Sequence, residues 1–218
     1  MKKLFLILLL GPVGLLADAY TTPDLFRSDV TVTWLGIDYS HVTLTGNFAE
    51  FFEAGSKSTW QIRDLYFPQW NAIILEEPMK YDIRGMLRKS DIRFDIDMIA
   101  ARNAQTPLEE METYNPARFT EEDIRAFVRQ YDLTGKEGIG IVIIAENLNK
   151  NALEAWYHFV AVDMSTGNVL LQQRLRGEPK GFGFRNYWAN SIYRVIRNIR
   201  DYYYWEWRRQ IETKGEQV

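Results

Sequence analysis

An uninterrupted apolar run in the second half of the chain places the strongest constraint on its fold. Residues 139–145 read Ile-Gly-Ile-Val-Ile-Ile-Ala and carry no polar side chain. Seven residues are short for a helix, and the β-branched residues favour a strand that is covered on both faces. Because such a strand needs a packed layer on either side, the run predicts the central strand of a layered domain.

Two further strands follow this run. Residues 156–163 and 169–175 are both rich in apolar and aromatic residues, and the segment Ser165-Thr-Gly-Asn168 separates them. Gly167 suits a turn position with positive φ, so the two segments are predicted to pair as an antiparallel hairpin.

Helical and extended patterns alternate along the rest of the chain. The expected elements are a strand over 30–39 that 42–44 extends, a helix over 64–77 that Pro78 ends, a helical piece over 81–89, a strand over 91–98, a helix between Thr120 and Gly135, and a helix over 188–211. Residues 46–58 are expected to form a loop or a short helical turn, and 103–118 a polar connector. This alternation predicts a single α/β layered domain, and the terminal hairpin makes its sheet mixed.

The amino-terminal residues have the three parts of a secretory signal peptide. Lys2 and Lys3 give a positive head, 4–16 form an apolar run, and 17–19 read Ala-Asp-Ala, a small-x-small pattern. A membrane anchor is disfavoured because a run of about 13 residues is shorter than the roughly 20 that span a bilayer. We therefore expect cleavage before Tyr20, a mature domain over 20–218, and a location in the periplasm or outside the cell.

Composition narrows the classes of function. The chain has no cysteine and a formal net charge of −3. The lack of cysteine excludes thiolate zinc sites, cysteine nucleophiles and a cysteine-linked lipid anchor. A mildly acidic chain lacks the basic footprint of a general nucleic-acid binder, so no nucleic-acid partner is expected. No cofactor and no transmembrane anchor in the mature chain are expected either.

The hairpin carries a resemblance to known proteins. Residues 159–170, Phe-Val-Ala-Val-Asp-Met-Ser-Thr-Gly-Asn-Val-Leu, resemble the "strand, Asp, x, x, Thr-Gly, x, Val-Leu" hairpin of envelope α/β domains. These are the periplasmic domain of the curli-secretion pore, the penicillin-binding-protein activator lipoproteins and the amino-terminal domain of TolB. Residues 181–188, Gly-Phe-Gly-Phe-Arg-Asn-Tyr-Trp, are similar to a stretch in uncharacterised exported envelope proteins. The resemblance implies a non-enzymatic envelope module that binds another protein, without the lipid anchor or the pore.

A glycine-rich segment before the last predicted helix is the first candidate binding site. Glycines allow a close backbone approach, and a helix start attracts anions. The candidate residues for binding a carboxylate, a phosphate or a peptide terminus are Lys180, Gly181, Gly183 and Arg185. The alternative is a tight turn in which Phe182 and Phe184 fill the core and Asn186 caps the helix.

The end of the last predicted helix is the second candidate. Its expected buried stripe is Trp188, Ile192, Val195, Ile196, Ile199 and Tyr203. Aromatic residues beyond it fall on every side of the helix, and one packed face cannot bury them all. The candidate partner-binding residues are Tyr202, Tyr204, Trp205, Trp207 and Arg208. Tyrosine, tryptophan and arginine are enriched at protein interfaces, so an envelope protein is the expected partner. A glycan, a membrane surface and a second copy of the chain remain alternatives.

Chemistry-bearing residues give a weaker second hypothesis, an unfamiliar hydrolase. Asp91, Asp95 and Asp97 share one face of the predicted strand, as a pair of glycosidase carboxylates would. Asp38 and His41 could supply two metal ligands, which are too few for a closed metal site. His158 lies in an apolar predicted strand, a position that is typical of a hydrogen-bonded core histidine. No catalytic or metal-binding residue is therefore predicted, and a binding module without cofactor is the leading expectation.

Overall fold

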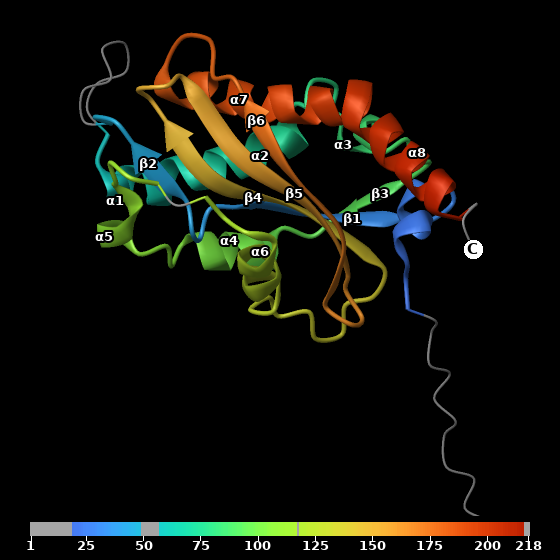
Figure 1. The fold of residues 1–218 in the computed structure, drawn as a ribbon. Coiled ribbons are helices and arrows are strands. Elements are labelled where there is room, and N and C mark those ends of the chain that lie inside the picture. Colours follow the sequence, from blue (N-terminus) through green and yellow to red (C-terminus); the bar gives the residue numbers. More distant parts are fainter. Residues whose placement is uncertain (1–18, 49–56, 117, 216–218) are drawn as a thin grey trace, which may run out of the picture.

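The computed structural model describes residues 19–48, 57–116 and 118–215 (Figure 1). Its strands are β1 (Val32–Asp38), β2 (Thr43–Thr45), β3 (Ile92–Phe94), β4 (Ile139–Asn149), β5 (Glu154–Asp163) and β6 (Asn168–Gly177). Among these residues they form one six-stranded sheet in the order β3-β1-β4-β5-β6, with β2 paired to β4. β1 runs parallel to β3 and β4, whereas β4, β5 and β6 are antiparallel. The predicted α/β domain with a mixed sheet is confirmed.

Helices occupy the connections from β2 to β3 and from β3 to β4, and they flank the sheet at both ends of the described chain. They are the 3₁₀-helix η1 (Thr22–Phe26), α1 (Thr59–Gln61), the π-helix η2 (Ile62–Tyr66), α2 (Phe67–Glu76), α3 (Ile83–Met86), α4 (Asp97–Asn103), α5 (Leu108–Met111), α6 (Glu121–Val128), α7 (Phe184–Asn198), the π-helix η3 (Ile199–Tyr203) and α8 (Tyr204–Gly215). Within the described residues, no helix combines the length and the apolarity needed to cross a bilayer.

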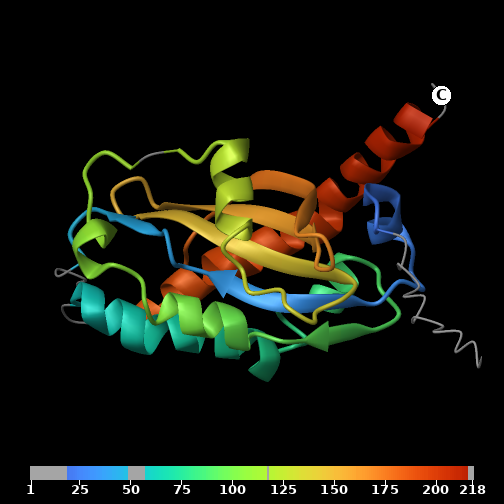
Figure 2. The same cartoon turned by 90° about the horizontal axis from the view of Figure 1, so that it is seen from below.

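The central strand β4 divides the interior into two packed clusters. Its residues from 139 to 148 are all buried, and up to residue 145 their side chains alternate between the two clusters. The larger cluster lies between the sheet and the layer of α2, α7 and α8, and the smaller one lies under α4 and α6. Figure 2 shows α8 extending past the sheet beside the amino-terminal segment. The prediction of a central strand covered on both faces is confirmed.

Two asparagine side chains hold β1 beyond the point where β3 ends. Asn71 of α2 accepts from the Ile37 amide at 2.7 Å and donates to its carbonyl at 3.1 Å. Asn103 of α4 accepts from the Tyr39 amide at 2.6 Å and donates to the Ile37 carbonyl at 2.8 Å. These amides replace the missing strand. Gly36 permits the approach, since its φ is +111° and a Cβ there would lie 2.8 Å from Asn71 Oδ1.

The sheet is interrupted at the carboxyl end of β1. β1 pairs with β4 up to the level of residue 144, and β2 resumes the pairing at residue 147. The register of β4 against β5 shifts at the same level, between 145 and 147. β2 therefore continues the edge of β1, as predicted, after a break at 39–42 that faces a bulge at Glu146. Bulges recur next to functional sites because they redirect a side chain.

Four predicted boundaries were wrong. The helix predicted between Thr120 and Gly135 ends at Val128, as α6. The predicted strand over 91–98 ends at Phe94, and Asp97 begins α4. The helix predicted from residue 64 begins at Thr59, and the last helix begins at Phe184 rather than Trp188. The predicted signal peptide lies outside the described residues except for Ala19, and so does most of the predicted loop over 46–58.

Candidate functional site

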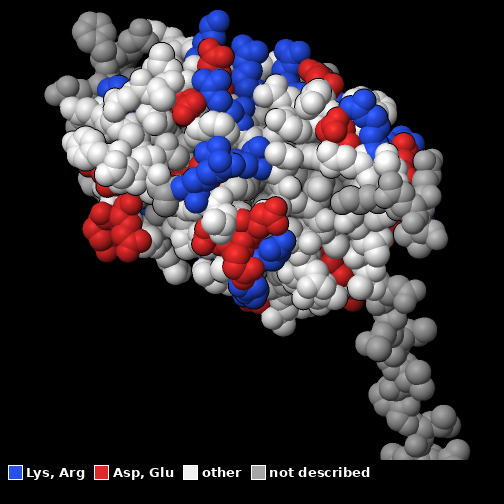
Figure 3. Space-filling model, in the orientation of Figure 1, with Lys and Arg blue, Asp and Glu red and all other residues white. Residues whose placement is uncertain are grey.

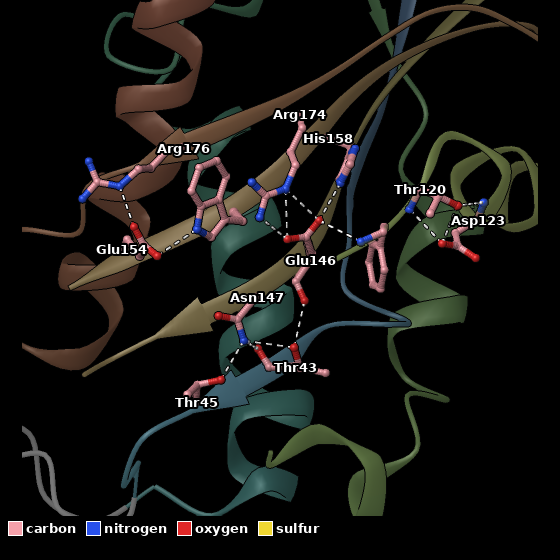
Figure 4. A network of polar contacts seen from close by, with 12 residues as sticks. Thr43, Thr45, Thr120, Asp123, Glu146, Asn147, Glu154, His158, Arg174 and Arg176 are labelled. Carbon is pink, nitrogen blue, oxygen red and sulfur yellow. Dashed lines mark hydrogen bonds and ion pairs between the residues drawn. The ribbon is translucent and has the colours of Figure 1, made fainter. Parts of the chain in front are cut away.

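Glu146 is the centre of a buried polar network on the sheet face beside α6 (Figure 4). It is 2% exposed. Arg174 of β6 donates to both carboxylate oxygens, from Nε at 3.0 and 3.1 Å and from Nη2 at 2.5 Å. His158 of β5 donates from Nε2 at 2.8 Å, and the Phe119 amide donates at 3.1 Å. Glu146 lies on the same face of the sheet as Ile144, and it meets partners from two other strands and from the segment before α6.

These partners keep Glu146 ionised. Burial by itself raises the pKa of a carboxyl group, but the hydrogen bonds from His158 and Arg174, the charge of Arg174 and the Phe119 amide outweigh it and lower the pKa of Glu146 to about 2. A carboxyl group with so low a pKa is a poor proton donor near neutral pH, since general acids work best with a pKa near the working pH. Glu146 therefore acts as a fixed negative charge.

The network continues along the open part of the same sheet face. The Arg174 guanidinium lies 3.5 Å from the centre of the Trp156 ring. The Trp156 indole N–H donates to Glu154 at 2.9 Å, and Glu154 pairs with Arg176 at 2.7 Å. Figure 3 shows acidic and basic side chains gathered over α6 and a basic group beside them on this face.

A hollow of about 390 Å³ opens beside the network. Its lining includes Arg118, Phe119 and Thr120 from the segment before α6, and His158 and Arg174 from the sheet. The Thr120 hydroxyl is occupied in capping α6, where it exchanges hydrogen bonds with Asp123. This reciprocal pair is a capping box, and it removes the hydroxyl from the reactive groups of the hollow.

A second polar cluster lies at the carboxyl end of β1. Asp38 is 0% exposed and accepts from the Tyr131 hydroxyl at 2.7 Å and from the Ser40 amide at 2.8 Å, with Arg102 Nε 3.7 Å away. Burial and the Asp38 charge raise the pKa of Tyr131 well above its usual value. His41 packs beside this cluster, and its burial lowers its pKa.

Aromatic rings join the two clusters. His41 stacks on Phe127 with 3.8 Å between ring centres, Phe127 meets Phe119 edge to face, and Phe119 lies 6.0 Å from His158. His158 is the hydrogen-bonded core histidine that the sequence predicted. Among the described residues, no group of three or more His, Asp and Glu side chains is arranged to hold a metal ion. The geometry fixes charges and rings in place under α6.

The predicted aromatic helix end divides into a surface side and a core side. Tyr202 and Trp205 are 59% and 42% exposed. The Arg88 guanidinium lies 4.3 Å from the Trp205 ring centre, and Arg88 itself has a φ of +52°, a left-handed conformation unusual for this residue. A hollow of about 430 Å³ on this helix face is lined by Tyr202, Trp205, Arg208 and neighbouring charged residues.

Tyr204 and Trp207 belong to the core side. They are 3% and 2% exposed, so they present no open ring. Trp207 stacks on Phe159 of β5 at 4.9 Å, and Tyr204 packs against Phe26 of η1 at 5.4 Å. These two candidate residues therefore hold α8 on the domain.

The glycine-rich segment lies at the opposite end of the same helix. Gly181 and Gly183 have φ values of +114° and +79°, and Gly183, rather than Asn186, occupies the cap position of α7. Phe184 is buried but Phe182 is exposed, so only one of the two rings fills the core. Lys180 is exposed, and Arg185 lies 3.7 Å from Glu76. About 30 Å of helix separates this segment from Tyr202, so the two candidate sites do not form one surface.

The three candidate aspartates are not brought together on one strand face. Asp91 precedes β3, Asp95 follows it and pairs with Lys136, and Asp97 lies in the first turn of α4. The prediction of a shared carboxylate face was wrong because the strand ends before Asp95.

No protein-family model matches this chain, and no curated protein matches it at a significant level.

Proposed function

We propose that this protein is an exported binding module of the cell envelope that contacts a protein partner through the exposed side of η3 and α8. The observation that carries the proposal is the open pair Tyr202 and Trp205, with the Arg88 guanidinium over the Trp205 ring. Exposed tyrosine, tryptophan and arginine side chains gathered on one face have the composition of an interface hot spot.

The charges on this surface favour a partner with acidic groups. Arg208 pairs with Glu212 and Arg209 with Glu206. The contacts that described residues make with the Arg88 guanidinium are with the rings of Tyr204 and Trp205. Its charge is therefore available to a partner carboxylate, and opposite charges across an interface guide association.

The exposed rings of this face are amphipathic. Tyr202 and Trp205 each present an apolar ring with one polar group, the tyrosine hydroxyl and the indole N–H, and this combination suits a protein contact. Their edge-to-face contacts are with Tyr203 and with the buried Tyr204.

Crosslinking in intact cells, followed by recovery of the full-length chain, tests the proposal. Tyr202→Ala/Trp205→Ala is compared with the native chain and with Trp60→Ala, which removes a 51% exposed tryptophan from α1. We expect one envelope protein to crosslink to the native chain and to Trp60→Ala, with at least about tenfold lower recovery for the double variant.

Two results would contradict the proposal. Equal recovery of the same protein by all three chains would show that the contact lies away from this face. Retention on envelope polysaccharide that depends on Tyr202 and Trp205, with no protein crosslink, would identify a glycan binder instead.

A further inference from the structure

Tyr20 lies against a buried carboxylate at the end of β5. Its backbone N–H donates to Asp163 Oδ2 at 3.2 Å, between residues 143 positions apart. Asp163 is the last residue of β5 and is 0% exposed. The contact ties the residue after the expected cleavage site to the β5–β6 hairpin.

The donors around Asp163 are all neutral in the uncut chain. Besides the Tyr20 amide, the Ser165 amide donates to Oδ1 and the Thr166 hydroxyl donates to Oδ2, each at 3.0 Å. Among the described residues, no lysine, arginine or histidine lies within ion-pair distance of this carboxylate. A buried carboxylate is costly unless a positive charge compensates it.

We propose that cleavage before Tyr20 supplies the missing charge, so that the new α-ammonium group of the mature chain forms a buried ion pair with Asp163. The inference rests on the export that forms part of the proposed function. Water adds across the peptide bond between Ala19 and Tyr20, and the C–N bond breaks. Ala19 keeps a carboxylate, and the Tyr20 amine takes a proton because an α-amino group has a pKa of about 8.

The surroundings of Tyr20 are built to hold a chain end in this place. Ala19 is exposed, whereas Tyr20 is half-buried and packs on the larger core cluster. Two residues on, the Thr22 hydroxyl donates to the Leu170 carbonyl of β6 at 2.7 Å, and Leu25 of η1 is 0% exposed. The segment after the cleavage site is therefore fixed, while the bond to be cut lies at the surface.

The ion pair would also fix one wall of a cavity beside the β5–β6 hairpin. This cavity measures about 950 Å³, and its lining includes Tyr20 and the hairpin turn from Met164 to Asn168. The Asp163 carboxylate holds that turn through the Ser165 amide and the Thr166 hydroxyl. A positive charge on the Tyr20 amine would therefore act on the same carboxylate that holds the turn.

A double-mutant cycle on the mature chain tests the ion pair. One chain begins at Tyr20, and a second carries two alanines ahead of Tyr20, which move the positive charge away. Each is made with Asp163 and with Asp163→Asn. We expect the extension to lower the folding equilibrium constant about tenfold or more with Asp163, and less than about twofold with Asp163→Asn. Equal effects in the two backgrounds would overturn the ion pair.

A second measurement needs no substitution in the core. The native mature chain is treated with acetic anhydride at constant pH, and the acetylation rate of the Tyr20 amine is compared with that in urea, with the exposed Lys180 amine as internal reference. We expect protection of the Tyr20 amine by at least about tenfold on folding. Equal reactivity in the two states would overturn the inference.

Mass spectrometry of the chain recovered from the envelope separates this inference from the proposed function. A first residue of Tyr20 is expected. An exported chain that begins at another residue overturns the inference and leaves the α8 proposal standing, whereas a chain retained uncut inside the cell overturns the export itself.

Discussion

Glu146 is the residue on which the polar network beside α6 depends. Glu146→Gln keeps the size of the side chain but removes the charge that faces Arg174 and His158. Because a largely buried guanidinium then lacks its counter-charge, we expect the free energy of unfolding to fall by about 3 kcal/mol, measured by urea denaturation.

Glu154→Gln is the matched control for this variant. It removes a partly exposed carboxylate that pairs with Arg176 on the same sheet face. Surface ion pairs contribute little, so the expected loss is less than about 1 kcal/mol. An equal loss in the two variants would show that the burial of the Glu146 network contributes nothing extra.

The low pKa of Glu146 also makes a prediction about pH. The pKa rises from about 2 in the folded chain to its ordinary value of 4.5 on unfolding, so the ionised form stabilises the fold above pH 4.5. This contribution, about 3 kcal/mol, is lost as the pH falls from about 5 to about 2. The difference in unfolding free energy between the native chain and Glu146→Gln should therefore shrink over that range. A difference that stays constant from pH 7 to pH 3 would contradict the assignment.

At the scale of elements, a π turn explains which aromatic residues of the last helix are buried. The predicted stripe placed Tyr203 after Ile199, at the usual spacing of four. The π-helix η3 inserts one extra residue, so the buried positions after Ile199 are Tyr204 and Trp207. The sequence showed that one face could not bury every ring, but the insertion that decides which rings are exposed depends on packing against β5 and η1.

This division predicts different costs for two neighbouring tryptophans. Trp207→Ala removes a ring that stacks on Phe159, and we expect a loss of about 3–5 kcal/mol in unfolding free energy. Trp205→Ala removes an exposed ring and its contact with Arg88, at a cost of about 1 kcal/mol or less. Thermal or urea unfolding of the two variants measures the difference, and similar losses would mean that α8 packs through its other face.

Continuous apolar runs predicted the central strands of the sheet correctly. The alternating pattern at the edge strand predicted a strand that was too long. The apolar run over 139–145 and the two segments of the hairpin after it were predicted as strands, and they form β4, β5 and β6. Residues 91–98 alternate just as regularly, yet β3 stops at Phe94 because α4 must begin at Asp97 to bring Asn103 to β1. That requirement is tertiary and leaves no mark on the local pattern.

The candidate site was visible in the sequence only in part. Glu146 directly follows the apolar run over 139–145, His158 is the single histidine of the next predicted strand, and the two residues are 12 positions apart. Glu146 follows Ile144 by two positions and Ile144 pairs with His158, so the two side chains lie on one face of the sheet. The register that pairs these residues is set by the sheet and is not marked by residue type. The register of β6 places Arg174 opposite His158. Residue types alone do not predict this register.

At the scale of the whole molecule, the layered arrangement predicts a gradient of local stability. β4 has paired strands on both sides and packed clusters on both faces. β3 is three residues long, lies at the edge of the sheet and has two exposed side chains. Opening β4 requires both clusters to separate, whereas β3 can open with little loss of buried surface.

Amide hydrogen exchange measures this gradient. We expect the amides of residues 141–144 to exchange most slowly, with a free energy equal to that of global unfolding, and those of β3 and η1 to exchange through local opening at lower cost. The exposed side of α8 should place that helix between these limits, because Tyr204 and Trp207 hold it on one face alone. Protection in α8 as strong as in β4 would show that the helix and the sheet open only together, and it would make the surface offered to a partner as rigid as the core.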